Sequence, residues 1–457
     1  MTINANDLEG LIDERPEKGL FRIHRRMFTD EAIFELEMKY IFEANWVYVA
    51  HESQLPKAHD YLTTYIGRQA VIINRGKDGR IGGFINSCKH RGAVVELLRL
   101  GNKKVFMCPF HGWCYSSGGD LLDCADNANA GYSAHFDKSK FGLTAIPKIE
   151  SYRGFIFASL SADVVPLGTH LGGATRAIDL IVDQDPDGHI EVVPGHQSYT
   201  FDGNWKLQAE NGVDGYHVDT IHANYVQTVG HRRQMMAERD AVKALDVGGI
   251  DKLPGGFYAF ENGHVMLWNE WPNPQVRPAY AGRAQYIERY GEARANWMTS
   301  YLRNLLIYPN VFLMDQISTQ IRVFRPLAID KTEVRTVCFA PANEAAEHRA
   351  HRIRQYEDFF NASGMATPDD LAAFNASQVG FNAGLVEWND ISRGAVNVVA
   401  GADEHARTIG LEPIVSGTNL QNEGIFVSLH RHWLHTLKSA LERDKQGKLA
   451  GQTRHVA

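Results

Sequence analysis

The fold of this 457-residue chain is decided by Cys88-Lys89-His90-Arg91-Gly92 and, further on, by Cys108-Pro109-Phe110-His111-Gly112-Trp113. Each stretch supplies one thiolate and one imidazole, as C-x-H and then C-x2-H, with 17 residues between His90 and Cys108. Two cysteines and two histidines can close a tetrahedral zinc site, but zinc fingers usually place both cysteines before both histidines. The alternating order favours a [2Fe–2S] cluster of the Rieske type, in which two cysteines hold one iron and two histidines hold the other.

The composition excludes several classes of protein. Hydrophobic residues make up 44% of the chain and charged residues 22%, as in ordinary soluble globular proteins. The net charge is 47 − 54 = −7 and no strongly basic domain stands out, which argues against a nucleic-acid-binding protein. No apolar run approaches the roughly 18–20 residues of a membrane span. The N-terminus has no basic-then-apolar signal pattern, so we expect a cytoplasmic protein.

The five cysteines stand at positions 88, 108, 114, 124 and 338. An odd number of cysteines in a chain without an export signal does not indicate a disulfide framework. Cys114 and Cys124 lie close to the two stretches but outside their pattern, and we interpret them as small core residues.

The pattern of apolar residues predicts an α+β protein. Asp30–Glu43 carries the broad apolar face of a helix. Short apolar runs separated by turn residues follow, which predicts a compact all-β module over residues 44–158. Mixed helix and strand patterns then predict an α+β domain over residues 159–457, with a helix at 208–216 and a strand at 318–325.

A second set of metal-binding residue types lies in Glu210-Asn211-Gly212-Val213-Asp214-Gly215-Tyr216-His217-Val218-Asp219-Thr220-Ile221-His222. At about 100° per residue, His217 and His222 lie about 140° apart on an ideal helix, so we expect a local distortion or a helix end there. Two histidines and one carboxylate form the facial triad of non-haem Fe(II) oxygenases. The carboxylate should come from a distant segment, and the best-placed candidate is Asp390 in Trp388-Asn389-Asp390-Ile391-Ser392-Arg393-Gly394.

Asp214 precedes His217 by three residues and cannot readily enter the same coordination sphere. Its predicted role is to accept the N–H of a ligand imidazole, which fixes the tautomer and the basicity of the ring. The alternative is a solvated carboxylate on a helix surface. A histidine pair by itself is more often a surface or core feature than a metal site. Here the same chain also contains a cluster motif that can donate single electrons, and an oxygen-activating iron needs such a donor. The cluster motif therefore favours an iron site at the two histidines.

These motifs resemble the large (α) subunit of Rieske non-haem iron aromatic-ring-hydroxylating dioxygenases, over about residues 19–437. The nearest branch contains the benzoate or toluate, 2-halobenzoate and anthranilate enzymes. The narrower likeness is carried by His51-Glu52-Ser53-Gln54, Met314-Asp315-Gln316-Ile317-Ser318, Arg354-Gln355-Tyr356-Glu357-Asp358-Phe359-Phe360, Gly364-Met365-Ala366-Thr367-Pro368-Asp369-Asp370 and Trp388–Gly394. One departure, Val94-Val95-Glu96-Leu97 in place of a common Leu-Cys pair, includes no ligand.

The resemblance implies two ligand sets: Cys88, His90, Cys108 and His111 for the cluster, and His217, His222 and Asp390 for the iron. Asp214 would be the bridge between the cluster of one subunit and the iron of its neighbour. The resemblance further implies that residues 1–43 belong to a helix-grip catalytic domain into which the Rieske domain is set. It also implies an α3β3 assembly with a small β subunit, and electrons from NADH through a separate flavin/iron–sulfur reductase.

The implied activity adds both atoms of O2 to adjacent ring carbons of an aromatic carboxylate. A ring carboxylate needs a cationic or hydrogen-bonding partner in an otherwise apolar cavity. Arg303 and Arg322 are possible anchors, and the alternative for each is a structural or surface arginine. Cys108–Tyr115 and Asp137-Lys138-Ser139 resemble the anthranilate enzymes most. Anthranilate, giving catechol, carbon dioxide and ammonia, is therefore expected ahead of 2-halobenzoate and benzoate.

Three other readings of the sequence stay open. A Rieske electron carrier would need no second histidine pair and no large domain beyond the cluster. A zinc-stabilised binding module would use the same four cysteine and histidine residues for a different metal. A Rieske monooxygenase would share all the ligands, so the motifs do not separate it from a dioxygenase.

Overall fold

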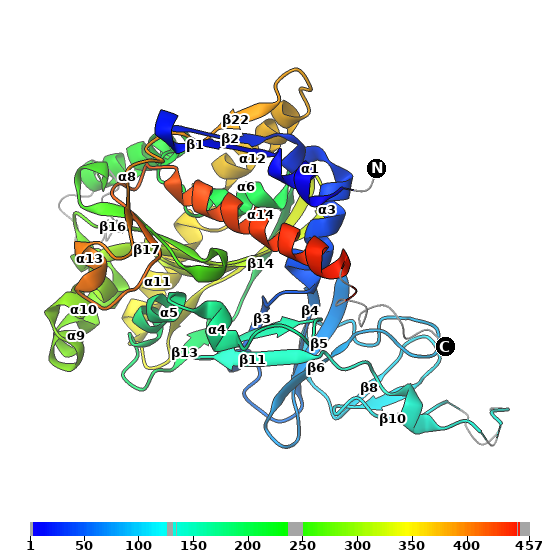
Figure 1. Ribbon diagram of the computed structural model, residues 1–457. Helices are drawn as coiled ribbons and strands as arrows, with labels where there is room; N and C mark the ends of the chain where they lie inside the picture. Colours follow the sequence, from blue (N-terminus) through cyan, green and yellow to red (C-terminus); the bar gives the residue numbers. More distant parts are fainter. Residues whose placement is uncertain (1–2, 126–130, 134, 236–249, 446, 448–457) are drawn as a thin grey trace. The chain divides into compact units, whose positions relative to one another are not determined.

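The computed structural model describes residues 3–125, 131–133, 135–235, 250–445 and 447, and its chain forms two compact units (Figure 1). The smaller unit is Ile41–Leu167, and the larger unit combines Met1–Tyr40 with Gly168–Ala457. The smaller unit is therefore an insertion in the chain of the larger one. Helices and sheets are both present, which confirms the predicted α+β class. Among the described residues, no helix has the length and apolar character needed to cross a membrane.

The smaller unit consists of antiparallel sheets. A four-stranded sheet has the order β6-β5-β4-β7, and two three-stranded sheets have the orders β11-β12-β3 and β10-β9-β8. The strands are β3 Val47–His51, β4 Asp60–Ile66, β5 Gln69–Arg75, β6 Ile81–Ile85, β7 Leu100–Asn102, β8 Val105–Met107, β9 Cys114–Ser116, β10 Leu121–Asp123, β11 Lys148–Tyr152 and β12 Phe155–Ser159. One apolar core of this unit contains three cysteines and includes Tyr61, Cys88, Phe106, Cys108, Trp113, Tyr115 and Cys124.

The larger unit is built on a nine-stranded antiparallel sheet with the order β14-β20-β19-β18-β17-β16-β15-β24-β23. Its strands are β14 Gln197–Phe201, β15 Gly255–Ala259, β16 Val265–Glu270, β17 Tyr301–Ile307, β18 Val311–Asp315, β19 Thr319–Ala328, β20 Lys331–Val337, β23 Val398–Ala400 and β24 Val415–Gly417. Two small sheets accompany it, made of β1 Ile12–Arg15, β2 Leu20–His24 and β22 Trp388–Asp390, and of β13 Ile190–Val192 and β21 Phe339–Pro341.

The α-helices are short except for α8, α11, α12 and α14. They are α1 Ala5–Glu9, α2 Arg26–Thr29, α3 Glu31–Glu37, α4 Leu167–Leu171, α5 Ala174–Val182, α6 Trp205–Asn211, α7 Val218–Ile221, α8 Ala223–Met235, α9 Arg283–Tyr290, α10 Glu292–Thr299, α11 Ala346–Phe359, α12 Thr367–Phe381, α13 Glu404–Arg407 and α14 Gly424–Lys445. Helix α3 continues into a π-helical turn over Met38–Glu43, so the helix predicted over residues 30–43 is present, with its second half wound as a π-helix.

The two faces of the large sheet have different neighbours, because successive strand residues point to opposite sides. On one face Arg303 and Asp315 pair across β17 and β18, and Gln184, just after α5, donates to Asp315 at 2.7 Å. On the other face Asn304 donates to the carbonyl of Gly212, just after α6, at 2.9 Å. Since helices cover both faces, β17 and β18 are buried along nearly their whole length.

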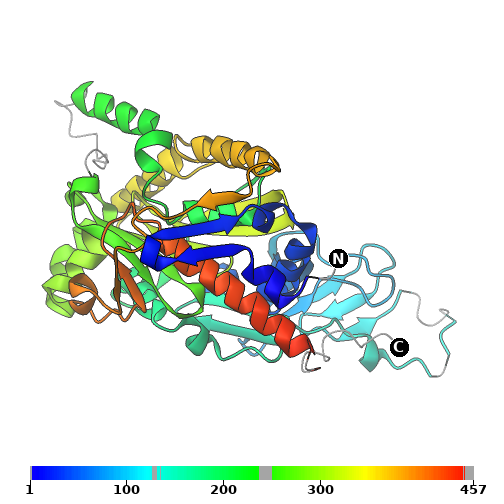
Figure 2. The ribbon, with the colours of Figure 1, turned by 45° about the horizontal axis from the view of Figure 1, so that its top comes forward.

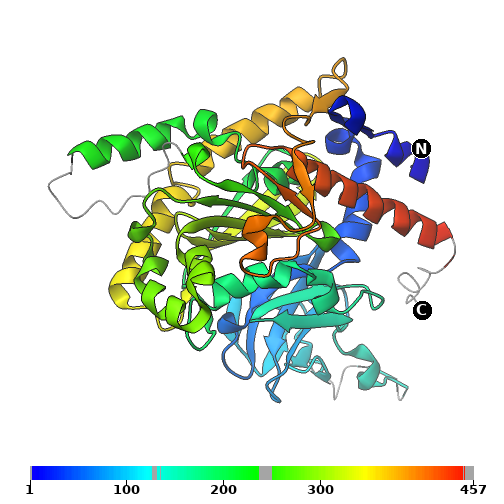
Figure 3. The same ribbon diagram turned by 60° about the vertical axis from the view of Figure 1, so that its left-hand side comes forward.

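The N-terminal segment is tied to the larger unit by a buried ion pair. Lys206 of α6 lies 2.5 Å from the carboxylate of Glu37 in α3, and the indoles of Trp205 and Trp433 donate to the same carboxylate. Helix α14, which carries Trp433, is the long red helix of Figure 3, and it contacts β15 of the large sheet. Figure 2 shows β1 and β2 running beside α14. The segment of residues 3–40 is therefore packed into the larger unit through Glu37.

Candidate metal centres

The cysteines and histidines of the smaller unit lie on two loops of equivalent backbone geometry. The N–H of Gly92 donates to the carbonyl of Cys88 at 2.9 Å, and the N–H of Gly112 donates to the carbonyl of Cys108 at 3.0 Å. The N–H of each cysteine bonds to the carbonyl five residues on, at 2.8 Å in both loops. Both glycines adopt a positive φ, 74° and 68°, which a side chain would disfavour. Each loop is thereby bent back around its own cysteine.

The two cysteines lie together on the buried side of the loops, and the two histidines lie together on their outer side. Cys88 and Cys108 are buried in the apolar core, whereas the rings of His90 and His111 lie 4.5 Å apart between centroids, His90 exposed and His111 half-buried. Among the described residues, no three of these four donors converge on one point. A single tetrahedral zinc ion requires that convergence. The pairing instead suits a two-iron cluster with cysteines on the inner iron and histidines on the outer iron.

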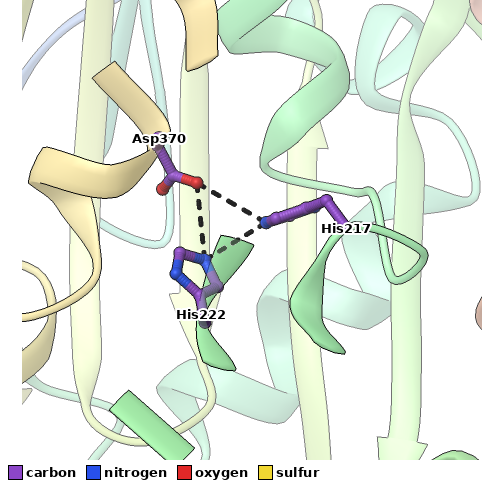
Figure 4. Close-up of side chains that lie close together, drawn as sticks. All are labelled: His217, His222 and Asp370. Atoms are coloured by element: carbon purple, nitrogen blue, oxygen red, sulfur yellow. Dashed lines mark hydrogen bonds and ion pairs between the residues drawn. The ribbon is translucent and has the colours of Figure 1, made fainter. Parts of the chain in front are cut away.

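The second centre, in the larger unit, is built around α7. This helix has only four residues, with His217 immediately before it and His222 immediately after it, which confirms the expected helix end. The Nε2 atoms of the two histidines lie 3.2 Å apart. Both face the Oδ1 atom of Asp370, at 3.5 Å from His217 and 3.4 Å from His222 (Figure 4).

The structure corrects the expectation for the third ligand. Asp370 converges with the two histidines, whereas Asp390 does not belong to this group. Asp390 lies at the end of β22, exposed, and its carboxylate accepts hydrogen bonds from the backbone N–H and the hydroxyl of Ser392 at 2.9 and 3.1 Å. It therefore closes a local turn. Asp370 lies in the first turn of α12, where an acidic residue is also favoured by the helix dipole, and this ordinary role concealed it in the sequence.

The segment before α7 is not helical throughout, contrary to the helix expected over 208–216. Helix α6 ends at Asn211, and a Cβ atom on Gly212 would lie 2.4 Å from the ring of Phe312. The backbone at Gly212 thus approaches the sheet more closely than any side chain allows. Residues 212–217 are not helical, and His217 lines the same cavity as Asn304 of β17.

Two further side chains support the histidines. Asn211 donates to Oδ1 of Asp370 at 3.1 Å and lies 3.4 Å from Nε2 of His217. Asp214 places its Oδ2 atom 3.2 Å from Nδ1 of His217, on the side of the ring opposite Asp370. Burial opposes the charged form of His217, but the Asp214 and Asp370 carboxylates raise its pKa above the ordinary value. Burial lowers the pKa of His222.

The three ligand atoms fit one metal ion. If three ligand atoms lie about 2.1 Å from one metal ion at right angles to one another, they are about 3 Å apart. The observed distances between the three donor atoms, 3.2–3.5 Å, are close to this value. Two imidazole nitrogens and one carboxylate oxygen are the donor set of the non-haem Fe(II) facial triad. Asp214 can hold Nδ1 of His217 protonated, which leaves the Nε2 lone pair free for the metal.

A largely apolar cavity opens from this centre. Its lining includes the two histidines and Asp370, with Asn304 and Arg322 among the few other polar side chains. The remaining wall is mostly hydrophobic and aromatic: Val218, Tyr225, Val226, Ile250, Leu267, Trp271, Leu302, Met314, Ile317, Phe359, Phe360 and Leu420. A concave apolar site with a few convergent polar groups is the usual form of a small-molecule site.

The two arginines expected as substrate anchors lie in different surroundings. Arg303 is on the opposite face of the sheet, where it and Arg277 form ion pairs with Asp315, and it does not line the cavity. Arg322 lines the cavity and is 5% exposed. Its Nε donates to Gln320 at 2.9 Å, and within the described chain no carboxylate forms an ion pair with it.

Comparison with known proteins agrees with both centres. Residues 191–434 match the family described as "Ring hydroxylating alpha subunit (catalytic domain)", and residues 45–140 match the "Rieske [2Fe-2S] domain". The chain belongs to the ring-hydroxylating dioxygenase alpha subunits. This alpha subunit is 48% identical to the 2-halobenzoate 1,2-dioxygenase large subunit of Burkholderia cepacia, with 96% of this chain and 94% of that protein covered.

Two other relatives are nearly as similar to this alpha subunit. It is 46% identical to the toluate 1,2-dioxygenase subunit alpha of Pseudomonas putida, covering 97% of both chains, and 45% identical to the anthranilate 1,2-dioxygenase large subunit of Acinetobacter baylyi, covering 96% and 94%. The fold matches naphthalene 1,2-dioxygenase from Rhodococcus sp. with a TM-score of 0.80 at 23% identity, covering 92% and 94%. These similarities place the alpha subunit in the benzoate, halobenzoate and anthranilate branch.

Membership of this family implies a Rieske [2Fe–2S] cluster and a mononuclear iron in the alpha subunit. The paired cysteines and histidines of the smaller unit and the convergent donors of the larger unit fit these two groups. Sequence reasoning missed Asp370 and Asn211 as parts of the iron centre. Asp370 does stand at the end of Gly364–Asp370, one of the stretches that carry the resemblance to this branch.

Proposed function

We propose that this alpha subunit adds both atoms of O2 to the ring of an aromatic carboxylate, with anthranilate as its substrate ahead of 2-halobenzoate and benzoate or toluate. The observation that carries the substrate class is Arg322. It is a buried cation in the wall of an apolar cavity that also contains His217, His222 and Asp370.

The environment of Arg322 suits a carboxylate. A guanidinium group binds a carboxylate through two parallel N–H···O bonds, and such bonds are strongest away from water. Arg322 uses its Nε on Gln320 and lies 5.9 Å from the centroid of the Phe360 ring. A buried charge without an ionic partner is costly, and an anionic ligand in the cavity would neutralise it. Arg303 cannot serve in this way, because Asp315 already neutralises it on the other side of the sheet.

The surroundings of Asn304 favour a substrate that carries an amino group ortho to its carboxylate. Its Nδ2 donates to the carbonyl of Gly212, and its Oδ1 is buried with no hydrogen-bond partner. The fixed amide therefore presents a lone acceptor in the lining of the cavity. The amino group of anthranilate is a donor, whereas a chlorine or hydrogen atom at the same ring position is not. A buried acceptor that is left unpaired lowers the affinity for such analogues.

The proposed reaction consumes anthranilate, O2, two electrons and two protons. Oxygen atoms bond to C1 and C2 of the ring, and the resulting aminodiol loses ammonia and carbon dioxide to leave catechol. When bound, the metal groups supply electron storage and dioxygen activation, chemistry that no side chain provides. Cys88, His90, Cys108 and His111 would hold the cluster, and His217, His222 and Asp370 the iron. The apolar wall of the cavity excludes water from the bound ring.

The protein's own groups fix the geometry for this chemistry. Asp214 orients His217 through Nδ1, and Asn211 orients the carboxylate of Asp370. Arg322 would hold the ring carboxylate, and with it the two ring carbons that react. Precise placement of this kind can account for a large part of a rate enhancement.

We further infer the partners from the family. A small β subunit in an α3β3 assembly and a flavin/iron–sulfur reductase that draws electrons from NADH are proposed, as for other large subunits of this class. No dinucleotide-binding fingerprint was found in the sequence, which supports a separate reductase.

Two other activities would use some of the same residues. A pure Rieske electron carrier has no use for the convergent set of His217, His222 and Asp370, so this set argues against it. A Rieske monooxygenase would use both centres and would incorporate one oxygen atom per turnover instead of two. The number of labelled oxygen atoms in the product separates it from a dioxygenase.

A single turnover of the pre-reduced, iron-loaded protein under ¹⁸O₂ tests the proposal, with anthranilate, 2-chlorobenzoate and benzoate offered in turn. Doubly labelled catechol and free ammonia from anthranilate, at a higher rate than product from the other two, is the expected result. A labelled cis-diol from benzoate alone would overturn the choice of anthranilate. One labelled atom per product would overturn dioxygenation, and no product from any of the three would overturn the substrate class.

A further inference from the structure

Gln320 lies beside Arg322, the buried arginine of the cavity wall. The two residues are two positions apart on β19, so their side chains lie on the same face of the sheet. Gln320 pairs with Met314 of β18 and Arg322 pairs with Phe312, and Met314 also lines the cavity. The Oε1 atom of Gln320 accepts a hydrogen bond from Nε of Arg322 at 2.9 Å, and the side chain of Gln320 is fully buried.

This hydrogen bond occupies one edge of the guanidinium group. A guanidinium has five N–H donors in a rigid plane, one on Nε and four on the two Nη atoms. Because Gln320 holds Nε, the direction of the two Nη atoms is fixed. Among the described residues no carboxylate forms an ion pair with them, and the ring of Phe360, which lines the cavity, lies 5.9 Å from the guanidinium carbon.

The partner of Arg322 is an amide, and this determines how much charge the arginine keeps. Arg303, on the opposite face of the sheet, is paired with the carboxylate of Asp315, which neutralises it. Gln320 accepts a hydrogen bond of the same kind but carries no negative charge. Arg322 is therefore held in place and remains a cation that an anionic ligand can neutralise.

We infer that Gln320 is the positioning residue of the substrate's carboxylate site: it directs the Nη atoms of Arg322 and, being neutral, leaves the positive charge to the substrate. The inference rests on the proposed function, in which Arg322 binds the ring carboxylate. An arginine side chain has several rotatable bonds, and fixing it before the substrate arrives reduces the entropy lost on binding. A guanidinium with a fixed direction also fixes the direction of the ring that it holds.

The test is a calorimetric titration of the protein, with its iron and cluster present, using benzoate and nitrobenzene as probes. Nitrobenzene has nearly the shape of benzoate without its charge. Gln320→Leu removes the acceptor, and the affinity for benzoate should fall about tenfold. Gln320→Glu keeps an acceptor of the same length but neutralises Arg322, so the affinity for benzoate should fall about 100-fold. The affinity for nitrobenzene should stay within about twofold of the wild-type value in both variants.

The matched control is Thr336→Val. Thr336 pairs with Arg322 across β19 and β20, is fully buried, and lies with its hydroxyl 2.8 Å from that of Tyr356. T336V therefore removes a polar group from the same face of the sheet without changing the hydrogen bond between Gln320 and Arg322. Its affinity for benzoate should equal that of the wild type. An equal loss of benzoate affinity in T336V would assign Gln320 to general packing and overturn the inference.

Parallel titration of Arg322→Met separates this inference from the proposed function. Wild-type affinity for benzoate in Q320L and Q320E, together with a loss in R322M, would overturn the role of Gln320 and leave Arg322 as the anchor. Wild-type affinity in R322M would overturn the anchor itself, and the role of Gln320 with it. An equal loss of benzoate and nitrobenzene binding in the Gln320 variants would show a damaged cavity and also contradict the inference. If Q320E does not retain its iron, Q320L decides the question.

Discussion

All four proposed cluster ligands of the smaller unit lie between Cys88 and His111, whereas the convergent residues of the larger unit extend from His217 to Asp370. The first centre is formed by two loops with the same backbone hydrogen bonds, and the strands next to them position both loops. The second centre needs a four-residue helix, the start of a distant helix and a glycine contact with the sheet.

Local spacing in the sequence therefore reveals a site only when one short segment supplies all its ligands. The order of cysteine and histidine in residues 88–111 contains nearly all the information about the cluster. At the iron centre, spacing identified the two histidines but not the carboxylate. If the two centres are independent, a substitution at one of them should leave the metal content of the other unchanged.

The largest effect is expected for Asp370→Ala. Removal of the only carboxylate that converges with His217 and His222 in the described chain should abolish iron binding in the larger unit. Product formation should fall more than about 100-fold, beyond the range typical of outer-sphere changes. Iron content per chain and the EPR signal of the reduced cluster are measured together, and the cluster signal should persist. Asp390→Ala is the control, and it should keep both the iron and the cluster signal, because the carboxylate of Asp390 hydrogen-bonds only to Ser392 among the described residues. Loss of iron in D390A and not in D370A would contradict the assignment of Asp370 as the ligand.

The reciprocal variant is Cys88→Ser. We expect the visible absorption and EPR signal of the cluster to disappear while the iron of the larger unit is retained. Multiple-turnover activity with a reductase should then be lost, because electrons no longer reach the protein. Loss of the mononuclear iron as well would show that the two centres depend on each other for folding.

Arg322→Met should lower kcat/KM for anthranilate and benzoate about 100-fold, because an unpaired ring carboxylate would remain in an apolar cavity. Any activity of the wild-type protein with a neutral aromatic substrate such as toluene should not fall in R322M, because that substrate has no carboxylate to bind.

Arg303→Met is the matched change on the opposite face of the sheet. It should leave KM unchanged and lower the free energy of unfolding by about 3–5 kcal/mol, because Asp315 loses one of its two buried cations. Denaturant unfolding and steady-state kinetics on both variants distinguish the two roles.

Asp214→Asn should reduce iron affinity or turnover by about 10–100-fold, as expected when a partner of a ligand imidazole is weakened. The carboxylate 3.2 Å from Nδ1 of His217 is replaced by an amide that can present an N–H there instead of an acceptor. Iron binding is followed by competition with a chelator. Unchanged affinity together with unchanged single-turnover rate would assign Asp214 to the surface role considered from the sequence.

The smallest effect is expected for Asn304→Leu, which removes one neutral acceptor. Preference for anthranilate over benzoate, as the ratio of kcat/KM values, should fall about tenfold, in the range of one hydrogen bond. Activity with benzoate should be nearly unchanged, which also controls for damage to the cavity. A ratio that stays constant would remove Asn304 as the selector of the ortho substituent.

The α+β class, the all-β character of the smaller unit and the pair His217 and His222 were all predicted from the amino-acid sequence, and a resemblance indicated the branch of the family. The fold class and the histidine pair depend on periodicity or on spacing within a short segment, which neighbouring residues fix locally, whereas the branch was indicated by the resemblance of longer stretches.

The folded structure was needed to show that Asp370, and not Asp390, converges with the two histidines, and that Arg322, and not Arg303, lines the cavity. Asp370 stands at the start of a helix and Asp390 at the end of a short strand, positions where an acidic residue is ordinary, and both arginines lie in buried strands. Their difference arises from long-range packing: which helix start lies over α7, and which face of the sheet lies beneath α6. Contacts between residues some 150 positions apart in the chain leave no periodic signal, so folding alone brings these side chains together.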